Sequence, residues 1–244
     1  MTEREGVHRT PYGLCIVESC LACPFRQERL FCNLSPPAVQ VLSSITAAST
    51  YPKGTLLFVE GQNPRGIFIL CSGRAKLWTS SSAGKTLILK IAEPGDVLGL
   101  EATVSGMPYQ MTGEVLEPSQ VNFIARESFR DFMHGHGEVA CKVAEELSNT
   151  QHTLFAEIRS LGLARRTPEK LARLLLDWTA NQHKGKAEVR LKLTLTHEEI
   201  GQMIGASRET VTRLLADFKK KQLVQIKGST LVVRRSALEN ILKA

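Results

Sequence analysis

Residues 194–223 have the pattern of two short helices joined by a tight turn. Apolar residues recur at helical spacing along both segments, first at Ile200, Met203 and Ile204 and then at Val211, Leu214, Leu215 and Phe218. Gly205 marks the turn. Ser207 is suited to cap the second helix, because its hydroxyl can accept a hydrogen bond from a free backbone N–H. The pattern predicts a helix-turn-helix.

The outer face of the second helix carries side chains that can recognise DNA bases. Four polar residues recur there at spacings of four, so their side chains project together near the N-terminus of the helix. A helix-turn-helix places that end in the major groove, where arginine can donate two hydrogen bonds to guanine and glutamate can accept one from cytosine. Surface helices in general also carry arginine and glutamate, but the turn, the amphipathic pattern and the polar set together favour DNA binding. The predicted DNA-binding residues are Ser207, Arg208, Glu209, Thr212 and Arg213.

Charge is distributed unevenly along the chain, which has a formal net charge of +7 over 244 residues. Residues 163–244 contain 17 lysine and arginine residues against 8 acidic residues, whereas residues 1–162 contain 14 against 16. The C-terminal third therefore has the positive charge that attracts DNA phosphates. No catalytic set of nucleophile and base is recognisable, so we do not expect an enzyme.

The chain lacks the marks of a membrane or secreted protein. No apolar run approaches the ~18 residues of a membrane span, and the N-terminus has no signal-peptide core. We therefore expect a cytoplasmic protein with no membrane partner. In that compartment, cysteines more often bind metal or sense redox state than form structural disulfides.

The rest of the pattern predicts a sheet-rich middle flanked by helices. A short helix is expected in residues 35–48, and short β-type runs separated by glycines predict an antiparallel barrel or sandwich in residues 51–126. The expected strands are residues 55–59, 67–71, 75–79, 86–91 and 120–124. Another helix begins at Thr167, followed by a polar connection over residues 179–192 and a hairpin, or wing, over residues 223–233.

Residues 138–163 predict one long helix with a narrow apolar seam. The seam consists of Val139, Val143, Leu147, Leu154, Ile158 and Leu161. Such a stripe suits coiled-coil pairing of two copies, and helix-turn-helix proteins commonly bind two half-sites as dimers. The alternative is an ordinary helix that packs on its own β-rich domain.

Short motifs in the chain are Lys53-Gly54, Glu60-Gly61, Ser72-Gly73, Pro94-Gly95-Asp96 and the block from Glu199 to Arg213. With these motifs, residues 34–244 resemble the catabolite-activator/fumarate-nitrate-reduction (CRP/FNR) family of bacterial transcription regulators. The resemblance implies an α+β fold with an N-terminal cyclic-nucleotide-binding-type β-roll, a long dimerisation helix and a C-terminal winged helix-turn-helix. It also implies a homodimer that binds a palindromic double-stranded DNA operator and contacts RNA polymerase. The expected parts are a cysteine-rich sensory segment (1–34), the β-roll (35–137), the dimerisation helix (138–163) and the DNA-binding domain (164–244).

The resemblance argues against a cAMP receptor. Nucleotide-binding members of the family carry a glutamate and an Arg-Ser pair in the turn that binds the phosphate. Here Leu100 stands at the glutamate position, with Glu101 next to it, and no arginine lies near Tyr109 and Gln110. A cyclic phosphate without that guanidinium would lose its main charge-assisted contact.

Four of the six cysteines fall within 18 residues of the N-terminal segment, in the pattern C-x4-C-x2-C-x8-C. They are Cys15, Cys20, Cys23 and Cys32. Thiolates at such spacing suit zinc or an iron–sulfur cluster. A disulfide switch and a chance grouping of inert cysteines are the remaining alternatives. Similarity to the oxygen-sensing FNR branch, which carries an N-terminal cysteine cluster, implies a [4Fe-4S] cluster whose iron these four cysteines bind.

One position departs from that branch, which usually takes its fourth ligand from a cysteine in the β-roll. Asn122 stands where that cysteine is expected, so the four N-terminal cysteines would complete the set alone. Cys71 and Cys141 are reserve candidates, although free cysteine is often simply a buried apolar residue. The predicted function is therefore a regulator that senses oxygen, nitric oxide or redox state. The alternative is a regulator with a small effector in the β-roll, whose cysteines bind zinc or act as a thiol switch.

Overall fold

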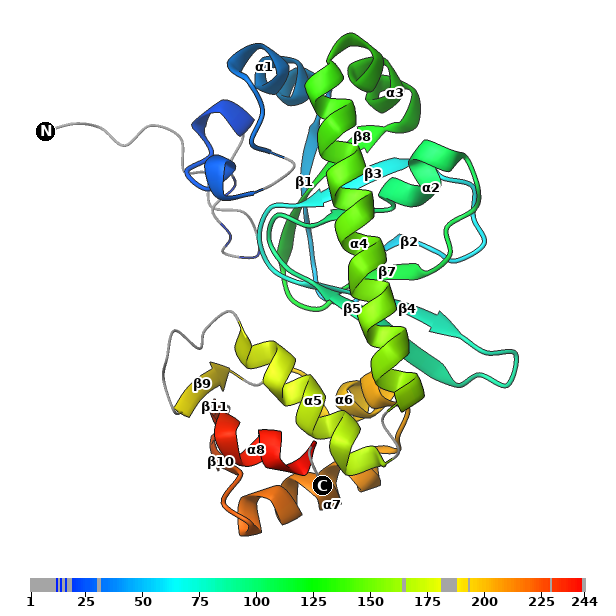
Figure 1. Ribbon diagram of the computed structural model, residues 1–244. Coiled ribbons are helices and arrows are strands. Elements are labelled where there is room, and N and C mark those ends of the chain that lie inside the picture. The colour runs from blue at the N-terminus through cyan, green and yellow to red at the C-terminus, as the bar shows by residue number, and fades with distance from the viewer. Residues whose placement is uncertain are drawn as a thin grey trace, which may run out of the picture. The chain divides into compact units, whose positions relative to one another are not determined.

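The computed structural model describes residues 12, 14, 16, 19–29, 32–163, 166–180, 188–192, 194–228 and 230–242. The chain divides into two compact units, with the boundary between His152 and Thr153 (Figure 1). The boundary falls inside helix α4, which runs from Gly137 to Leu163.

The first unit is the expected β-roll with its flanking helices. In its described part, antiparallel strands form one sheet in the order β1-β8-β3-β6 and another in the order β2-β7-β4-β5. The strands are β1 (Ala47–Tyr51), β2 (Leu56–Phe58), β3 (Gly66–Leu70), β4 (Ala75–Ser80), β5 (Thr86–Ala92), β6 (Val97–Leu98), β7 (Thr112–Val115) and β8 (Ser119–Ala125). The helical elements are the short turns η1 (Cys20–Ala22) and η2 (Arg26–Glu28) and helices α1 (Pro36–Ile45), α2 (Leu100–Ser105), α3 (Arg126–Gly135) and α4.

Two predictions for this unit need correction. The helix expected in residues 35–48 ends at Ile45, and Ala47 and Ala48 belong to strand β1, where they pair with β8. Strands β1, β6 and β7 lie outside the five predicted runs. These strands are short or contain few large β-branched residues, so local pattern gives them little signal.

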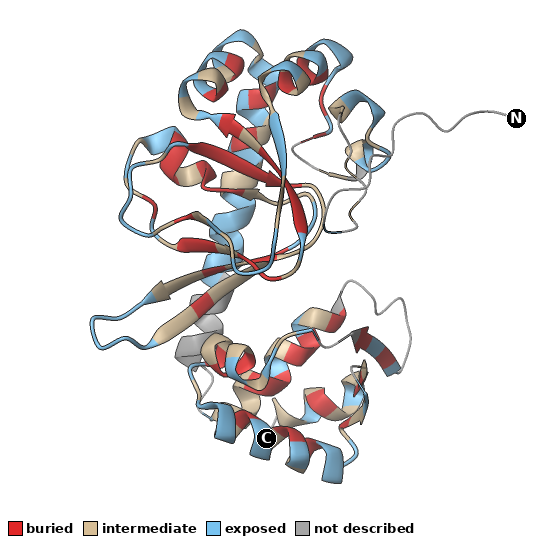
Figure 2. Ribbon diagram, turned by 180° about the vertical axis from the view of Figure 1, so that it is seen from behind, coloured by how far each residue is buried: buried red, intermediate tan, exposed pale blue. Residues whose placement is uncertain are grey.

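Strand β3 separates two apolar cores, because alternate side chains of a strand point to opposite faces. Phe68 and Leu70 face the interior of the roll, whereas Ile67 and Ile69 face an outer core shared with helices α1 and α3. All five residues of the strand are buried (Figure 2). We call the second cluster the outer core; it comprises Cys32, Leu34, Ala38, Val39, Leu42, Ile67, Ile69, Leu100, Ile124, Phe129, Phe132, Val139 and Val143.

The predicted seam of α4 divides into two parts. Val139 and Val143 are buried in the outer core, and Leu147 packs against it. This part of the helix therefore packs on its own β-rich domain, as the alternative interpretation expected. Farther along, Leu154 and Phe155 are exposed to 42% and 54% in the single chain.

The second unit is a winged helix-turn-helix. Its elements after α4 are α5 (Thr167–Ala180), β9 (Glu188–Lys192), α6 (His197–Ile204), α7 (Arg208–Lys220), β10 (Val224–Lys227), β11 (Thr230–Arg234) and α8 (Arg235–Ile241). In its described part, the strands form an antiparallel sheet in the order β10-β11-β9. Strands β10 and β11 make the predicted wing. The polar connection expected over residues 179–192 is wrong at both ends, because α5 continues to Ala180 and residues 188–192 pair with β11.

Among the described residues, no helix combines the length and the apolar character needed to cross a membrane.

Candidate functional sites

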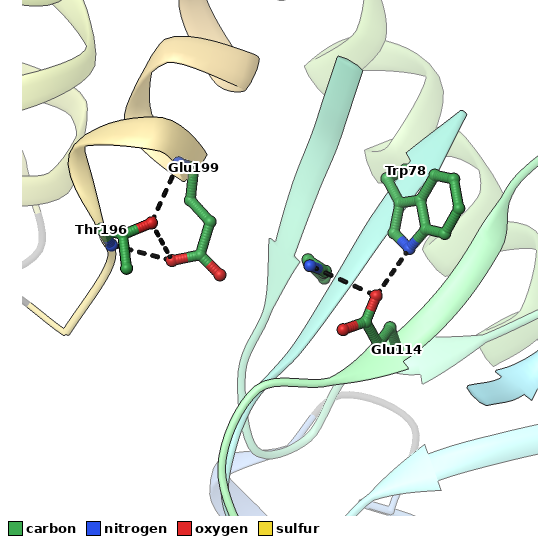
Figure 3. A network of polar contacts seen from close by, with 5 residues as sticks. Trp78, Glu114, Thr196 and Glu199 are labelled. Atoms are coloured by element: carbon green, nitrogen blue, oxygen red, sulfur yellow. Dashed lines mark hydrogen bonds and ion pairs between the residues drawn. The ribbon is translucent and has the colours of Figure 1, made fainter. Parts of the chain in front are cut away.

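The turn between α6 and α7 is fixed by local chemistry that the sequence encodes. Helix α6 begins with a capping box, in which Glu199 N–H donates to Thr196 Oγ1 at 3.2 Å and Thr196 N–H donates to Glu199 Oε2 at 2.8 Å (Figure 3). The helix ends at Gly205, whose φ of 69° favours glycine. A Cβ on Gly201 would lie 2.6 Å from the carbonyl oxygen of Ala206. Small residues at these positions therefore allow the close turn.

Helix α7 presents the predicted polar set to solvent. Ser207 caps it as predicted, with Thr210 N–H donating to Ser207 Oγ at 3.2 Å. The inward side chains Val211, Leu215 and Phe218 are buried and fix the rotation of the helix about its axis. The five predicted DNA-binding residues, Ser207, Arg208, Glu209, Thr212 and Arg213, are all exposed.

Two members of this set are held by neighbours. Hydrogen bonds from its own backbone N–H and from Ser207 hold the pKa of Glu209 below its usual value, so this carboxylate is an ionised acceptor at neutral pH. Thr212 Oγ1 donates to the carbonyl oxygen of Arg208 at 2.9 Å and lies 2.8 Å from Nδ1 of His197. The imidazole of His197 and the hydroxyl of Thr212 therefore share a hydrogen bond between the two helices. Helix α6 thus positions a side chain on the outer face of α7.

A second candidate site lies where the N-terminal segment meets the β-roll. Cys20 opens η1, Cys23 directly follows it, and the buried Cys32 belongs to the outer core. Asn122 Nδ2 donates to Cys20 Sγ at 3.9 Å, so the expected β-roll position does face this segment. Cys15 falls outside the described residues.

Cys71, which the sequence offers only as a reserve, is brought to the same place. It directly follows β3 and packs against the outer core together with Cys20. Its carbonyl oxygen accepts a hydrogen bond from Arg29 Nη2 at 2.9 Å, which ties the N-terminal segment to the end of β3. Cys141, the other reserve, lies exposed on α4.

These thiols are close enough to influence one another. Burial is the main cause that raises the pKa of Cys32 to about 11 and that of Cys71 to about 12. The next cause is a neighbouring thiolate, Cys20 for Cys32 and Cys32 for Cys71, whereas the charge of Arg29 lowers both pKa values. Burial and the charge of Cys23 also raise the pKa of Cys20. The donor chemistry fits a thiolate-bound metal group, because a cation compensates buried thiolate charge. Within the described part of the chain, no three potential ligands stand in a ready-made metal-binding arrangement.

The cysteine segment is joined to the first turn of α4. Ser35, three residues after Cys32, donates its backbone N–H to Glu138 Oε2 at 2.9 Å and its hydroxyl to Glu138 Oε1. These hydrogen bonds hold the pKa of Glu138 below its usual value. Cys32 also shares the outer core with Val139 and Val143 of the same helix. A change at the cysteines therefore has a direct physical route to α4.

The interior of the β-roll contains a buried aromatic side chain that follows helix α2 in the sequence. Tyr109 is only 2% exposed and stacks on Phe58, with ring centroids 4.5 Å apart. Its hydroxyl donates to the carbonyl oxygen of Gly66 at 2.9 Å and accepts from Arg65 N–H at 3.1 Å. Leu100 points to the outer core. These contacts fill this part of the roll with an aromatic side chain whose hydroxyl is hydrogen-bonded within the protein.

Both units match known protein families. Residues 48–136 match the cyclic nucleotide-binding domain, and residues 169–241 match the Crp-like helix-turn-helix domain. A CRP-like cAMP-activated global transcriptional regulator of Mycobacterium tuberculosis is 25% identical over 210 residues, which cover 85% of this chain and 92% of that protein. The fumarate and nitrate reduction regulatory protein of Vibrio cholerae is 25% identical over 239 residues, covering 97% of this chain and 94% of that protein.

A solved structure shows the same architecture. FixK2 from Bradyrhizobium japonicum superposes with a TM-score of 0.71 at 22% identity, covering 80% of this chain and 96% of that one. The two family matches together account for about two thirds of the sequence, in the order that the fold shows. The chain belongs to the CRP/FNR family of DNA-binding transcription regulators, whose members are not enzymes.

Proposed function

We propose that this regulator senses oxygen, nitric oxide or redox state through a [4Fe-4S] cluster held by cysteines of its N-terminal segment. The observation that carries the proposal is the position of Cys20 and Cys32 at the outer core, with Cys23 near enough to raise the pKa of Cys20, in a segment tied to the first turn of α4. Cys15 is the fourth ligand that the spacing predicts. The match to the Vibrio cholerae regulator spans 97% of this chain, so it includes this segment.

A bound cluster and the cysteines that hold it would have different roles in sensing. A bound [4Fe-4S] cluster would supply a redox-active iron–sulfur centre at these thiolates. The cysteines would hold the segment against the outer core, where Cys32 contacts the same cluster of side chains as Val139 and Val143. Without that attachment, the packing of Leu34 in the outer core and the hydrogen bonds from Ser35 to Glu138 would still join the chain after the cysteines to α4.

The output is DNA binding by a homodimer. Leu154 and Phe155 expose large apolar surfaces on α4, which a second copy of this helix would cover. Two copies of α7 would then reach half-sites one helical turn apart, about 34–36 Å, on a palindromic operator. Arg208, Glu209 and Arg213 would contact base edges, with Ser207 and Thr212 beside them, and the bound regulator would recruit RNA polymerase in the cytoplasm.

The decisive experiment compares protein prepared without oxygen with the same protein after exposure to air. The anaerobic sample should contain iron and acid-labile sulfide, show broad visible absorbance that bleaches in air, and change its operator affinity about tenfold on bleaching. Cys20→Ser should remove both the absorbance and the switch, whereas Cys141→Ser is the matched control at an exposed cysteine. Stoichiometric zinc without sulfide in the wild-type protein would reject iron–sulfur sensing and favour a zinc-stabilised or thiol-switched regulator.

A further inference from the structure

We infer that Cys71, at the end of strand β3, is the fourth thiolate of the cluster site, together with Cys20, Cys23 and Cys32. This inference rests on the proposed function, since it concerns the ligand set of the same site. It replaces Cys15 as the fourth ligand by a residue 39 positions beyond Cys32 in the sequence.

The register of the sheet places Cys71 beside the position occupied by Asn122. In the antiparallel pair of β3 and β8, Ile69 lies opposite Asn122. The pairing continues past the end of β3, because Cys71 N–H donates to the carbonyl oxygen of Gln120 at 2.8 Å. Residues two apart share a face, so Cys71 lies on the same face as Ile69 and is the diagonal neighbour of Asn122. Diagonal neighbours are about 7–8 Å apart.

The N-terminal segment is held against that same part of the face. The amide of Asn122 contacts Cys20 Sγ at 3.9 Å, and Arg29 Nη2 donates to the carbonyl oxygen of Cys71 at 2.9 Å. Arg29 lies between Cys23 and Cys32 in the sequence, so its contact anchors the middle of the cysteine segment at Cys71. Two separate contacts therefore bring the segment to neighbouring positions on β8 and β3.

The fold therefore places the thiol of Cys71, which directly follows β3, near the amide of Asn122 on β8. Cys20 and Cys71 pack against the outer core, and Cys32 is part of it. Three cysteines of one segment and one cysteine of the adjacent sheet make a four-thiolate set, which is the ligand number of a [4Fe-4S] cluster.

The test uses full-length variants purified without oxygen, with iron and acid-labile sulfide measured per chain. Cys71→Ser and Cys71→Ala should each lower both contents about tenfold or more, since loss of even an outer-shell partner commonly costs 10–100-fold in metal affinity. Cys15→Ser and Cys141→Ser should keep the wild-type content. If Cys71→Ser and Cys71→Ala retain the cluster while Cys15→Ser loses it, the inference is overturned and the proposed function stands.

A restored thiol separates a ligand from a residue that merely supports the fold. In the Cys71→Ser background, Asn122→Cys places a thiol on the same face, next to Cys20, and should recover iron and sulfide. Loss of the cluster in Cys71→Ser without recovery in this double variant would overturn the ligand role. If wild-type protein holds zinc and no sulfide, the proposal of iron–sulfur sensing is rejected. The zinc content of Cys71→Ser then tests the ligand role of Cys71. Loss of zinc in this variant supports that role, and an unchanged zinc content overturns it.

Discussion

Replacing Arg208 with alanine tests whether the outer face of α7 reads DNA bases. Arg208 is the first residue of α7, is exposed, and directly follows the cap at Ser207. Alanine is the best helix former, so the substitution should leave the helix and its buried face intact. The change in operator affinity should then report the lost arginine contact and little else.

The magnitude follows from the number of contacts removed. One bidentate arginine–guanine contact contributes about 1–3 kcal/mol of discrimination. A homodimer places one Arg208 on each half-site, so the substitution should cost about 2–6 kcal/mol for the whole operator. At 1.4 kcal/mol for each factor of ten, the lower limit is an increase of about 30-fold in Kd.

The assay is fluorescence anisotropy on operator DNA at several salt concentrations, together with binding-site selection. Lys219→Ala is a matched control, because Lys219 is exposed near the end of the same helix, whereas Lys221 is paired with Asp217 at 2.8 Å. Loss of a phosphate contact at Lys219 should weaken binding to all sequences alike and reduce the salt slope by about 1. Unchanged base preference in the selected sites of Arg208→Ala would refute the assignment.

Three further substitutions test other parts of the structure. Leu154→Glu should weaken both self-association, measured by sedimentation velocity, and operator affinity, and a variant that stays dimeric would place the dimer interface elsewhere. Tyr109→Phe should lower the free energy of unfolding by about 1–3 kcal/mol in chemical denaturation, because Gly66 C=O and Arg65 N–H lose their buried partner. Gly201→Ala should destabilise the DNA-binding unit by about 1–3 kcal/mol and weaken operator binding, since its Cβ meets the Ala206 carbonyl oxygen. Wild-type stability and affinity in that variant would contradict the tight turn.

Short-range signals explain which elements were predictable. The turn at Gly205, the cap at Ser207 and the helical spacing of Val211 and Leu215 all act within a few residues, and the structure shows each of them. Strand β9 was missed because its five residues follow a polar stretch and become a strand by pairing with β11, about forty residues later. Such pairing leaves little trace in the local pattern.

Helix α4 combines a feature that the local sequence predicts with one that only the tertiary structure shows. Its helical periodicity predicts the helix, but a stripe of apolar residues does not specify what covers it. The fold assigns Val139 and Val143 to the outer core and leaves Leu154 and Phe155 exposed. Of these two groups, the second is the one whose side chains are exposed.

Local pattern was enough to predict the helix-turn-helix, the glycine-punctuated antiparallel strands and the cysteine-rich segment, because caps, turns and periodicity depend on neighbours along the chain. The side chains that lie next to the cysteines are known only from the tertiary structure. The approach of Cys71 depends on the register of β3 with β8 and on the contact from Arg29, and the tie from Ser35 to Glu138 joins residues 103 positions apart. These contacts form only when distant segments share one core, so the pattern of any one segment cannot specify them.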